Sequence, residues 1–398
     1  MYQLIGDATL NETIAAICDR VYTNGLRFDG ALPLRSTDAW GKFELGGYGG
    51  WTDSFYTGMI YLAYGCTRDE KFLRLADRYQ DYYRKRAEND PDWCAKNQVL
   101  PLDHDTGFIF LLSQVLRYEL TGEAEAKTLA LKAADTLAAR FKPNGNYILA
   151  SDTWPWDTDP IFIEEKKGRI IIDSMMNIAL LFWASKVSGD SRYAQIATKH
   201  ANTVRTYMLR PDGSTIQAFK FDPVTGAPKS GEAGQGYGDD SCWARGQAWA
   251  LYGFTQTYEF TGDAAYFETA LQAAHYFVGH LQPHGLPVWD FACANQIFHP
   301  IDSSAAAIAL SGLLSLRRFT KDPAVEQGAQ RLLNGLLQHC SALSISGWES
   351  ILLHGCIGPA YQQGAESNIC IPFLDCPLVY GDYYFFEALL KLRDAPTA

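Results

Sequence analysis

Apolar residues recur at helical spacing along nearly the whole chain, whereas the alternating pattern of a β-strand is sparse. Two kinds of helix alternate: one is apolar on every side, and the other is apolar on one side only. We expect the apolar helices to begin near Trp51, His104, Ile171, Ser241, Asp302 and Gly381, and the one-sided helices near Asn11, Asp69, Glu123, Asp190, Asp263 and Asp322. The pattern therefore predicts twelve helices in six pairs.

A short turn joins each apolar helix to the one-sided helix that follows it. In "TYEFTGDAAYFETA", for example, Gly ends one helix and Asp opens the next, which is typical of a helical hairpin. A helix that is apolar all round belongs inside a protein, and a one-sided helix belongs at its surface. Two concentric rings satisfy both demands. The chain is thus predicted to be all-α, a single (α/α)6-barrel domain of six helical hairpins over residues 1–398.

The long connections predict where a functional site lies. They lead from an outer helix into the next inner helix and comprise residues 142–168, 209–240, 282–301 and 342–379. All of them open at the N-terminal ends of the inner helices. Long loops on a rigid scaffold commonly carry function, and helix N-termini offer free N–H groups to an anion. We expect the site at this end of the barrel.

Each inner helix has an Asp near its predicted start. An Asp in this position normally caps the helix, because its carboxylate accepts a hydrogen bond from a free backbone N–H. We predict this capping role for Asp53, Asp302 and Asp382. For Asp239 and Asp240, a cap and a supporting hydrogen bond are equally expected.

Asp173 and Asp105 are predicted to be different. Asp173 stands in the apolar stretch "RIIIDSMMNIALLFWAS", where an ionised carboxylate is costly, and Asp105 follows His104 at another inner helix start. Burial and a second carboxylate nearby raise a pKa, whereas the helix dipole lowers it. We expect the first two effects to prevail for at least one of the pair, which predicts an acid poised for proton transfer. His104 fits equally a core histidine that satisfies a backbone carbonyl.

The most distinctive stretch is "GQGYGDDSCWARGQAW". Arg245 and Trp249 lie four residues apart and share a helix face, close to Trp243. An Arg beside indoles can hold a carboxylate while the rings stack on a sugar. The alternative is a buried Arg that pairs with Asp239 or Asp240. The glycines do not follow a strand, so a nucleotide-binding loop is not predicted.

Composition and charge narrow the classes of partner. The 398-residue chain has a net charge of −11, which argues against nucleic acid or an anionic membrane, and its 10 Trp, 22 Tyr and 21 Phe suit a sugar-stacking cleft. The nine Cys form no C-x-x-C pair and the His residues lack metal spacing, so free thiols and no metal are expected. No signal peptide or apolar span of ~20 residues occurs. We expect a cytoplasmic protein.

Four stretches together resemble a known family. "HDTGF", "DSMMN", "GQGYGDDSCWARGQAW" and the closing "YGDYYFFEALLKL" are similar to the unsaturated glucuronyl hydrolases, glycoside hydrolase family 88. The resemblance runs from about Trp51 to the end of the chain. It implies an (α/α)6 barrel, in agreement with the helix pattern. It also implies hydrolysis without metal or cofactor of a disaccharide-sized oligosaccharide that ends in a Δ4,5-unsaturated uronic acid, by protonation of C4 and hydration of C5.

The resemblance also implies roles for individual residues. Asp173 matches the general acid and base, and Asp105 matches a second essential carboxylate. Trp154 and Trp156 are alternatives for one stacking position. The complete expected set of substrate-binding residues is Trp51, His104, Trp154, Trp156, Gln217, Gln235, Trp243, Arg245 and Trp249.

Two departures and two rival functions accompany the resemblance. Gln217 stands where the family usually has a His, and the loop 354–379 contains no Lys or Arg, which predicts an unsulfated neighbouring sugar. One rival is an inverting glycosidase that cleaves a saturated substrate with Asp105 and Asp173, since the same barrel hosts such enzymes. The other is a glycan-binding protein without turnover, which would not need a desolvated acid.

Overall fold

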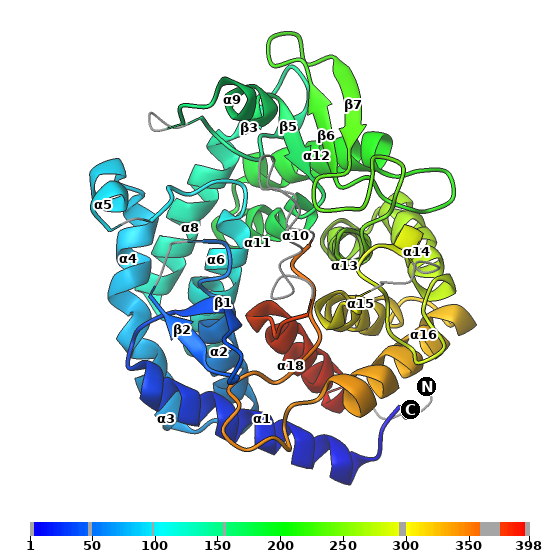
Figure 1. Ribbon diagram of the computed structural model, residues 1–398. Coiled ribbons are helices and arrows are strands. Elements are labelled where there is room, and N and C mark those ends of the chain that lie inside the picture. The colour runs from blue at the N-terminus through cyan, green and yellow to red at the C-terminus, as the bar shows by residue number, and fades with distance from the viewer. Residues whose placement is uncertain are drawn as a thin grey trace.

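The computed structural model describes residues 4–46, 50–97, 99–153, 157–293, 300–358 and 375–394. Its helices form an (α/α)6 barrel of two concentric rings, as the sequence predicts (Figure 1). The inner ring consists of α2 (Phe55–Thr67), α6 (Thr106–Phe110) with a π turn (Leu111–Val115) and α7 (Leu116–Thr121), α10 (Ser174–Asn177) with α11 (Ala179–Ser188), α13 (Ala244–Thr261), α15 (Ser303–Leu316) and α18 (Val379–Arg393).

The outer ring consists of α1 (Asp7–Phe28), α3 (Glu70–Ala76) with a 3-10 turn (Asp77–Tyr79) and α4 (Gln80–Glu88), α8 (Ala124–Ala139), α12 (Ser191–Met208), α14 (Ala264–Gly279) and α16 (Pro323–Gly335), which a π turn (Leu336–Cys340) extends. Each inner helix packs on the next, and α18 closes the ring against α2. Short helices α5 (Pro91–Lys96) and α9 (Pro160–Lys166) and a 3-10 turn (Phe291–Cys293) lie in the connections.

The turns between inner and outer helices form as the sequence predicts. The side chains of Asp69, Asp190, Asp263 and Asp322 each accept a hydrogen bond from the backbone N–H two residues later. Gly262 ends α13 at a φ of 68°, a left-handed conformation that only glycine adopts without strain. Glu123 occupies the same position before α8 but makes no capping bond. Repeated Gly-then-acid turns therefore mark the hairpins.

Burial follows the predicted division into inner and outer helices. Every residue of α15 is buried, whereas α12 buries one face that includes Tyr193, Ala197, Val204 and Met208. The apolar inner helices fill the centre of the barrel, and the outer helices cover them with a single apolar side. This packing leaves the inner helix ends as a rigid platform.

Short strands lie in the connections that lead into inner helices. They form antiparallel pairs β1 (Pro33–Thr37) with β2 (Phe43–Leu45) and β3 (Phe141–Lys142) with β4 (Tyr147–Ile148), and a three-stranded sheet β5 (Arg169–Ile171), β6 (Ala218–Phe221) and β7 (Pro228–Glu232). The β5–β7 sheet stands over one side of the ring (Figure 1). The first pair lies between α1 and α2, in a connection that the sequence analysis did not single out.

The capping prediction is confirmed for Asp302 and is wrong for Asp53 and Asp382. Asp302 accepts from backbone N–H groups at the start of α15. Asp53 lies two residues before α2 begins, and its carboxylate accepts a hydrogen bond from Tyr82 instead. Asp382 lies inside the first turn of α18, where its Oδ1 accepts from the N–H of Leu352 at 2.8 Å. Burial raises the pKa of Asp53 to about 6 and that of Asp382 to about 7.

The described cysteines are all free thiols. Within the parts of the chain given above, no helix combines the length and the apolar character that crossing a bilayer requires.

Candidate active site

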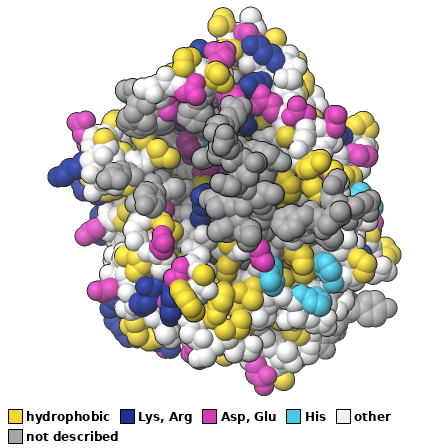
Figure 2. Space-filling model, in the orientation of Figure 1, with side chains coloured by type: hydrophobic (Ala, Val, Ile, Leu, Met, Phe, Trp, Pro, Cys, Tyr) yellow, Lys and Arg dark blue, Asp and Glu magenta, His cyan; other side chains and the backbone are white. Residues whose placement is uncertain are grey.

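A cavity of about 120 Å³ opens at the N-terminal ends of the inner helices. Figure 2 shows this face of the barrel, with acidic, basic and hydrophobic side chains together near the middle of the ring. The cavity brings together seven of the residues that the sequence analysis selected: Trp51, His104, Asp105, Asp173, Gln235, Trp243 and Arg245. These seven residues therefore lie together at the end of the barrel where the sequence predicts the site.

Asp105 and Asp173 stand at the N-cap positions of α6 and α10, yet neither side chain caps its helix. Asn177 joins them. Its Nδ2 donates to Asp105 Oδ1 at 3.0 Å and to the carbonyl oxygen of Asp173 at 3.2 Å, while its Oδ1 accepts from the N–H of Phe108 at 2.7 Å. A side chain at Gly107 would clash with Asn177, so glycine permits the two helix starts to approach. Both carboxyls are thereby directed into one cavity.

The pKa values of both carboxyls are raised. For Asp173 burial is the main cause and brings the pKa to about 6, although the charges of Arg245 and Arg169 act to lower it. For Asp105 burial comes first, followed by repulsion from Asp103 and Asp173, and its pKa lies well above the usual range. The expectation that burial and repulsion prevail over the helix dipole is confirmed. Asp173 Oδ2 makes no hydrogen bond within the described ranges.

His104 is buried beside the acids, with Nε2 3.5 Å from Asp105 Oδ1. Its Nδ1 makes no hydrogen bond to any described residue. Burial lowers the pKa of His104 to about 4, so the ring is neutral in the pH range where the acids titrate. His104 thus lines the site, and the alternative of a core histidine bound to a backbone carbonyl is wrong for the side chain seen here.

Arg245 is buried, but its partner differs from both predicted acids. Nη1 forms an ion pair with Asp302 Oδ2 at 3.0 Å, across 57 residues of sequence. The guanidinium lies 4.5 Å from the ring centre of Trp243 and 5.2 Å from that of Tyr380. Its Nη2 donates to the carbonyl of Ile357 at 2.9 Å. Arg245 therefore fixes the cavity wall, and most of its donor capacity is engaged by the protein.

Asp239 and Asp240 do not cap α13, whose N-cap residue is Trp243. Asp239 Oδ1 instead accepts from the N–H of Ala233 at 2.8 Å. Of the two expectations for Asp239, the supporting hydrogen bond is confirmed. The predicted pairing of these acids with Arg245 is wrong, because Asp302 at the start of the neighbouring inner helix takes that place.

Gln217 and Trp249 do not line the cavity; they lie directly behind it. Gln217 Nε2 donates to Gln235 Oε1 at 2.9 Å, and its Oε1 accepts from the Gln235 N–H. Gln235 in turn donates to the Ile357 carbonyl at 3.0 Å. Trp249 is fully buried, with its ring centre 5.1 Å from that of Phe108. The substrate contacts expected of these two side chains stay a prediction.

Trp154 and Trp156 lie outside the described residues. Four residues that line the cavity were not predicted: Arg35, Ile171, Ile357 and Tyr380. Tyr380 packs on Trp51 with ring centres 4.7 Å apart. For two of these four residues, Tyr380 and Arg35, the sequence contained a usable signal. Tyr380 begins a predicted inner helix, and Arg35 lies in the connection from the first outer helix to the first inner helix, which must open at the same end as the other long connections.

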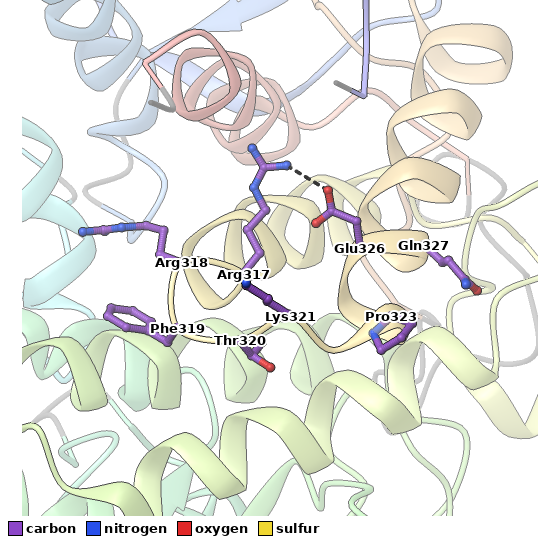
Figure 3. Close-up of a pocket in the computed structure, with 8 residues that line it drawn as sticks. All are labelled: Arg317, Arg318, Phe319, Thr320, Lys321, Pro323, Glu326 and Gln327. Atoms are coloured by element: carbon purple, nitrogen blue, oxygen red, sulfur yellow. Dashed lines mark ion pairs between the residues drawn. The ribbon is translucent and has the colours of Figure 1, made fainter. Parts of the chain in front are cut away.

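A larger cavity of about 640 Å³ lies at the turn between α15 and α16, at the other end of the barrel (Figure 3). The side chains of Arg317 and Glu326 face each other there, 3.7 Å apart. This cavity contains a single carboxylate, already paired, and cannot supply two acids. Across the described ranges, no group of three or more His, Cys, Asp or Glu is placed to hold a metal ion.

The cavity of this (α/α)6 barrel presents two desolvated carboxyls between Trp and Tyr rings, an arrangement that suits a glycoside hydrolase. The sequence profile of Glycosyl Hydrolase Family 88 matches residues 17–363, and the chain belongs to that family. The resemblance noted in the sequence is confirmed.

Known relatives agree with this assignment. An unsaturated chondroitin disaccharide hydrolase of Streptococcus pneumoniae is 32% identical over 351 residues, which cover 86% of this chain and 81% of that protein. The structure of the unsaturated glucuronyl hydrolase of Bacillus sp. GL1 has a TM-score of 0.84 at 30% identity, with 97% of each chain covered. A variant of the unsaturated glucuronyl hydrolase from Streptococcus agalactiae was solved in complex with dGlcA-GalNAc6S. That structure has a TM-score of 0.79 at 26% identity, with 100% of this chain and 94% of that chain covered.

Proposed function

We propose that this protein removes the terminal Δ4,5-unsaturated uronic acid from oligosaccharides released by polysaccharide lyases. The observation that carries the proposal is the state of Asp173. Its carboxyl is buried, its pKa is raised to about 6, and its Oδ2 has no hydrogen-bond partner among the described residues. Near neutral pH such a carboxyl holds a proton far more often than an ordinary Asp does, and it can give that proton to a substrate atom in the cavity.

The reaction begins with proton transfer from Asp173 to C4 of the substrate. The C4=C5 bond and the ring oxygen form an enol ether, so protonation of C4 places positive charge on C5, shared with that oxygen. Water then attacks C5, and the ionised Asp173 takes a proton from the water. The resulting hemiketal opens and releases the second sugar. One carboxyl therefore acts first as acid and then as base.

Asp105 supports this proton transfer. Two neighbouring carboxyls cannot both ionise readily, so the pair retains a proton at a pH where an isolated Asp has lost it. When ionised, Asp105 also stabilises the positive charge that develops at C5. Asn177 holds Asp105 through a 3.0 Å hydrogen bond, and neutral His104 lies beside it.

The aromatic wall supports the binding of a sugar ring. Trp51 and Tyr380 pack together at 4.7 Å between ring centres, and Trp243 lies under the Arg245 guanidinium. Aromatic faces suit the apolar C–H faces of a sugar, while Gln235 offers a polar contact whose position its bonds to Gln217 and Ile357 fix.

We propose further that residues 1–398 act as one catalytic domain. Arg20 on α1 supports this, since its Nη1 donates to the carbonyls of Ala342 and Ser350 at 2.8 Å each. The first helix is thereby joined to the connection that precedes the last inner helix.

The experiment that tests the proposed function compares the wild type with Asp173→Asn on a lyase-generated unsaturated disaccharide. The substitution keeps the size of the side chain and removes the proton source. The conjugated C=C–COO⁻ absorbance should disappear with the wild type and persist with the variant, which should still fold by circular dichroism and still bind the disaccharide. Turnover by the variant would remove Asp173 from the mechanism.

The same assay separates the rival functions. A wild type that cleaves saturated glucuronides as rapidly as unsaturated ones acts as an ordinary glycosidase, and an inverted product anomer would identify the inverting type. A wild type that binds both disaccharides and converts neither is a glycan-binding protein.

A further inference from the structure

Two cysteine side chains meet where the ring of helices closes. Cys18 on α1 and Cys66 in the last turn of α2 place their sulfur atoms 3.6 Å apart, although 48 residues separate them in the sequence. α1 and α2 pack on each other, and α18 packs on both (Figure 1). The two thiols therefore lie where the first helices of the chain contact the last one.

Cys66 differs from the other described cysteines. It is partly exposed, whereas the others are buried. Its pKa is lowered to about 7, because the Cys18 thiol donates a hydrogen bond to the Cys66 thiolate and the positive charge of Arg393 on α18 lies nearby. The thiolate is the reactive form of cysteine, so Cys66 is the thiol that an oxidant meets first.

The other thiols are protected from this reaction. The same hydrogen bond raises the pKa of Cys18, since Cys18 keeps the proton that it shares with Cys66. Burial raises the pKa of the remaining described thiols, which are Cys94, Cys242, Cys293, Cys340, Cys356 and Cys376. Cys66 thus combines access, a reactive thiolate and a second thiol in contact with it.

The distance between the two sulfurs suits a disulfide. Bonded sulfurs are about 2.05 Å apart, so those of Cys18 and Cys66 must approach each other by about 1.5 Å. Each sulfur turns about its own Cα–Cβ bond, and this rotation contributes to the approach before the helices have to shift. A disulfide here would fasten the outer helix α1 to the inner helix α2.

We propose that Cys18 and Cys66 form a reversible redox pair, which a peroxide converts into a disulfide across the closure of the barrel. The Cys66 thiolate attacks one oxygen of hydrogen peroxide, the O–O bond breaks, and a sulfenic acid and hydroxide form. The hydroxide takes up the proton that the Cys66 thiol had lost. Cys18 then attacks the sulfenic sulfur, the S–S bond forms, and the sulfenic oxygen leaves as water with the Cys18 proton.

This reaction balances without any group from the catalytic cavity. Both sulfurs are oxidised, the peroxide is reduced to two water molecules, and a dithiol reductant reverses the step. α2 has 13 residues, so about 16 Å separate Cys66 from the helix start near the cavity. The crosslink should therefore stabilise the fold and leave catalysis unchanged, and the inference does not depend on the identity of the substrate.

The test treats the reduced full-length protein with about one equivalent of hydrogen peroxide and maps its peptides by mass spectrometry. The intact mass should fall by two hydrogen atoms, and the Cys18 peptide should be joined to the Cys66 peptide. The Tm should rise by about 2–5 °C, because the crosslink restricts the unfolded chain, and should return to its first value after dithiothreitol. The rate of disaccharide conversion should be the same before and after oxidation.

Three variants guard the interpretation. Cys66→Ser should show neither the crosslink nor the rise in Tm under the same treatment, which separates the effect from oxidation elsewhere. Cys94→Ala, at a buried thiol on α5, is the matched control and should crosslink as the wild type does. Arg393→Gln removes the cation beside Cys66 and should slow crosslinking by about 3- to 5-fold.

The peptide map of the wild type decides the proposal even if a variant fails to fold. An oxygen added to Cys66 without a crosslink, a crosslink that joins other cysteines, or no reaction would overturn the redox pair. A Cys18–Cys66 crosslink that leaves the Tm unchanged would overturn the stabilising role. A protein that crosslinks as expected but converts no unsaturated disaccharide would contradict the proposed function alone.

Discussion

The Nδ2 of Asn177 lies 3.0 Å from Asp105 Oδ1, across 72 residues of sequence. The same amide group donates to the carbonyl of Asp173, so a single side chain connects the two inner helix starts that carry the acids. Gly107 provides the necessary space. The spacing of the two carboxyls is therefore set by a rigid contact between α6 and α10, not by the long loops around them.

This pairing predicts a bell-shaped pH profile for kcat/KM with both limbs above the ordinary Asp pKa of about 3.9. The active pair carries one proton. Activity is lost at low pH when both carboxyls are protonated, and at high pH when neither is. Burial raises both pKa values, to about 6 for Asp173 and well above the usual range for Asp105.

In Asp105→Asn the bell should become a single limb. A lone general acid works while it is protonated, so activity is present below its pKa and falls as the pH rises through about 6, the value for Asp173. Where turnover is too slow to follow, the carboxyl carbon-13 resonance of Asp173 reports the same pKa. A limb or titration near 4 would contradict the account.

Removal of the connecting amide should change both rate and pH dependence. Asn177→Ala deprives Asp105 of a hydrogen bond that acts to lower its pKa, so the alkaline limb should move to higher pH. Loss of alignment should reduce kcat by ~10–100-fold. Asn144→Ala, in the exposed β3–β4 turn, is the matched control and should leave both unchanged. A slower variant with an unmoved limb would mean that Asn177 serves packing only.

Asp382 should make stability depend on pH. Burial raises its pKa to about 7 in the folded protein, against about 3.9 when unfolded. Because the pKa of Asp382 is higher in the folded than in the unfolded protein, its contribution to the free energy of unfolding is fully present below about pH 4. This contribution is lost as the pH rises through 7. Asp382→Asn retains the bond from Leu352 N–H and cannot ionise. Between pH 5 and 8 the free energy of unfolding of the wild type should fall by roughly 3 kcal/mol more than that of this variant.

Denaturant unfolding of the wild type and the Asp382→Asn variant at the two pH values measures this difference. Asp81→Asn is the control, because the Asp81 side chain is 94% exposed. Parallel pH dependence of Asp382→Asn and the wild type would show that Asp382 stays ionised in the folded protein.

The barrel and the acid pair could be predicted because their signals are local. A Gly followed by a capping Asp marks a hairpin turn, and an acid inside an apolar helix start marks Asp173. Ion-pair partners that are brought together only by the packing of neighbouring inner helices carry no such local signal. Asp302 pairs with Arg245 across 57 residues, and sequence proximity favoured Asp239 and Asp240 instead. The capping roles predicted for Asp53 and Asp382 failed for a similar reason, because the exact residue at which each helix begins decides which residue can cap it.

The positions of Arg35 and Gln217 also depend on tertiary contacts that the local sequence does not reveal. Arg35 enters the cavity because a bridge ties Ser36 to Leu378, a contact between the two ends of the chain that closing the ring creates. Gln217 occupies the expected region but turns toward Gln235. Residue type and motif selected the region of the cavity, and tertiary packing decided which side chains line it.

Proton transfer to carbon is the central claim, and a proton NMR time course in heavy water tests it most directly. If Asp173 protonates C4, its acidic position exchanges with solvent between turnovers, and the released 4-deoxy-5-keto acid carries one deuterium on C4. Saturated glucuronides, which lack the basic carbon, should be very poor substrates under the same conditions. A product with only hydrogen on C4, or rapid cleavage of the saturated control, would show that the proton goes to the glycosidic oxygen and would contradict the account.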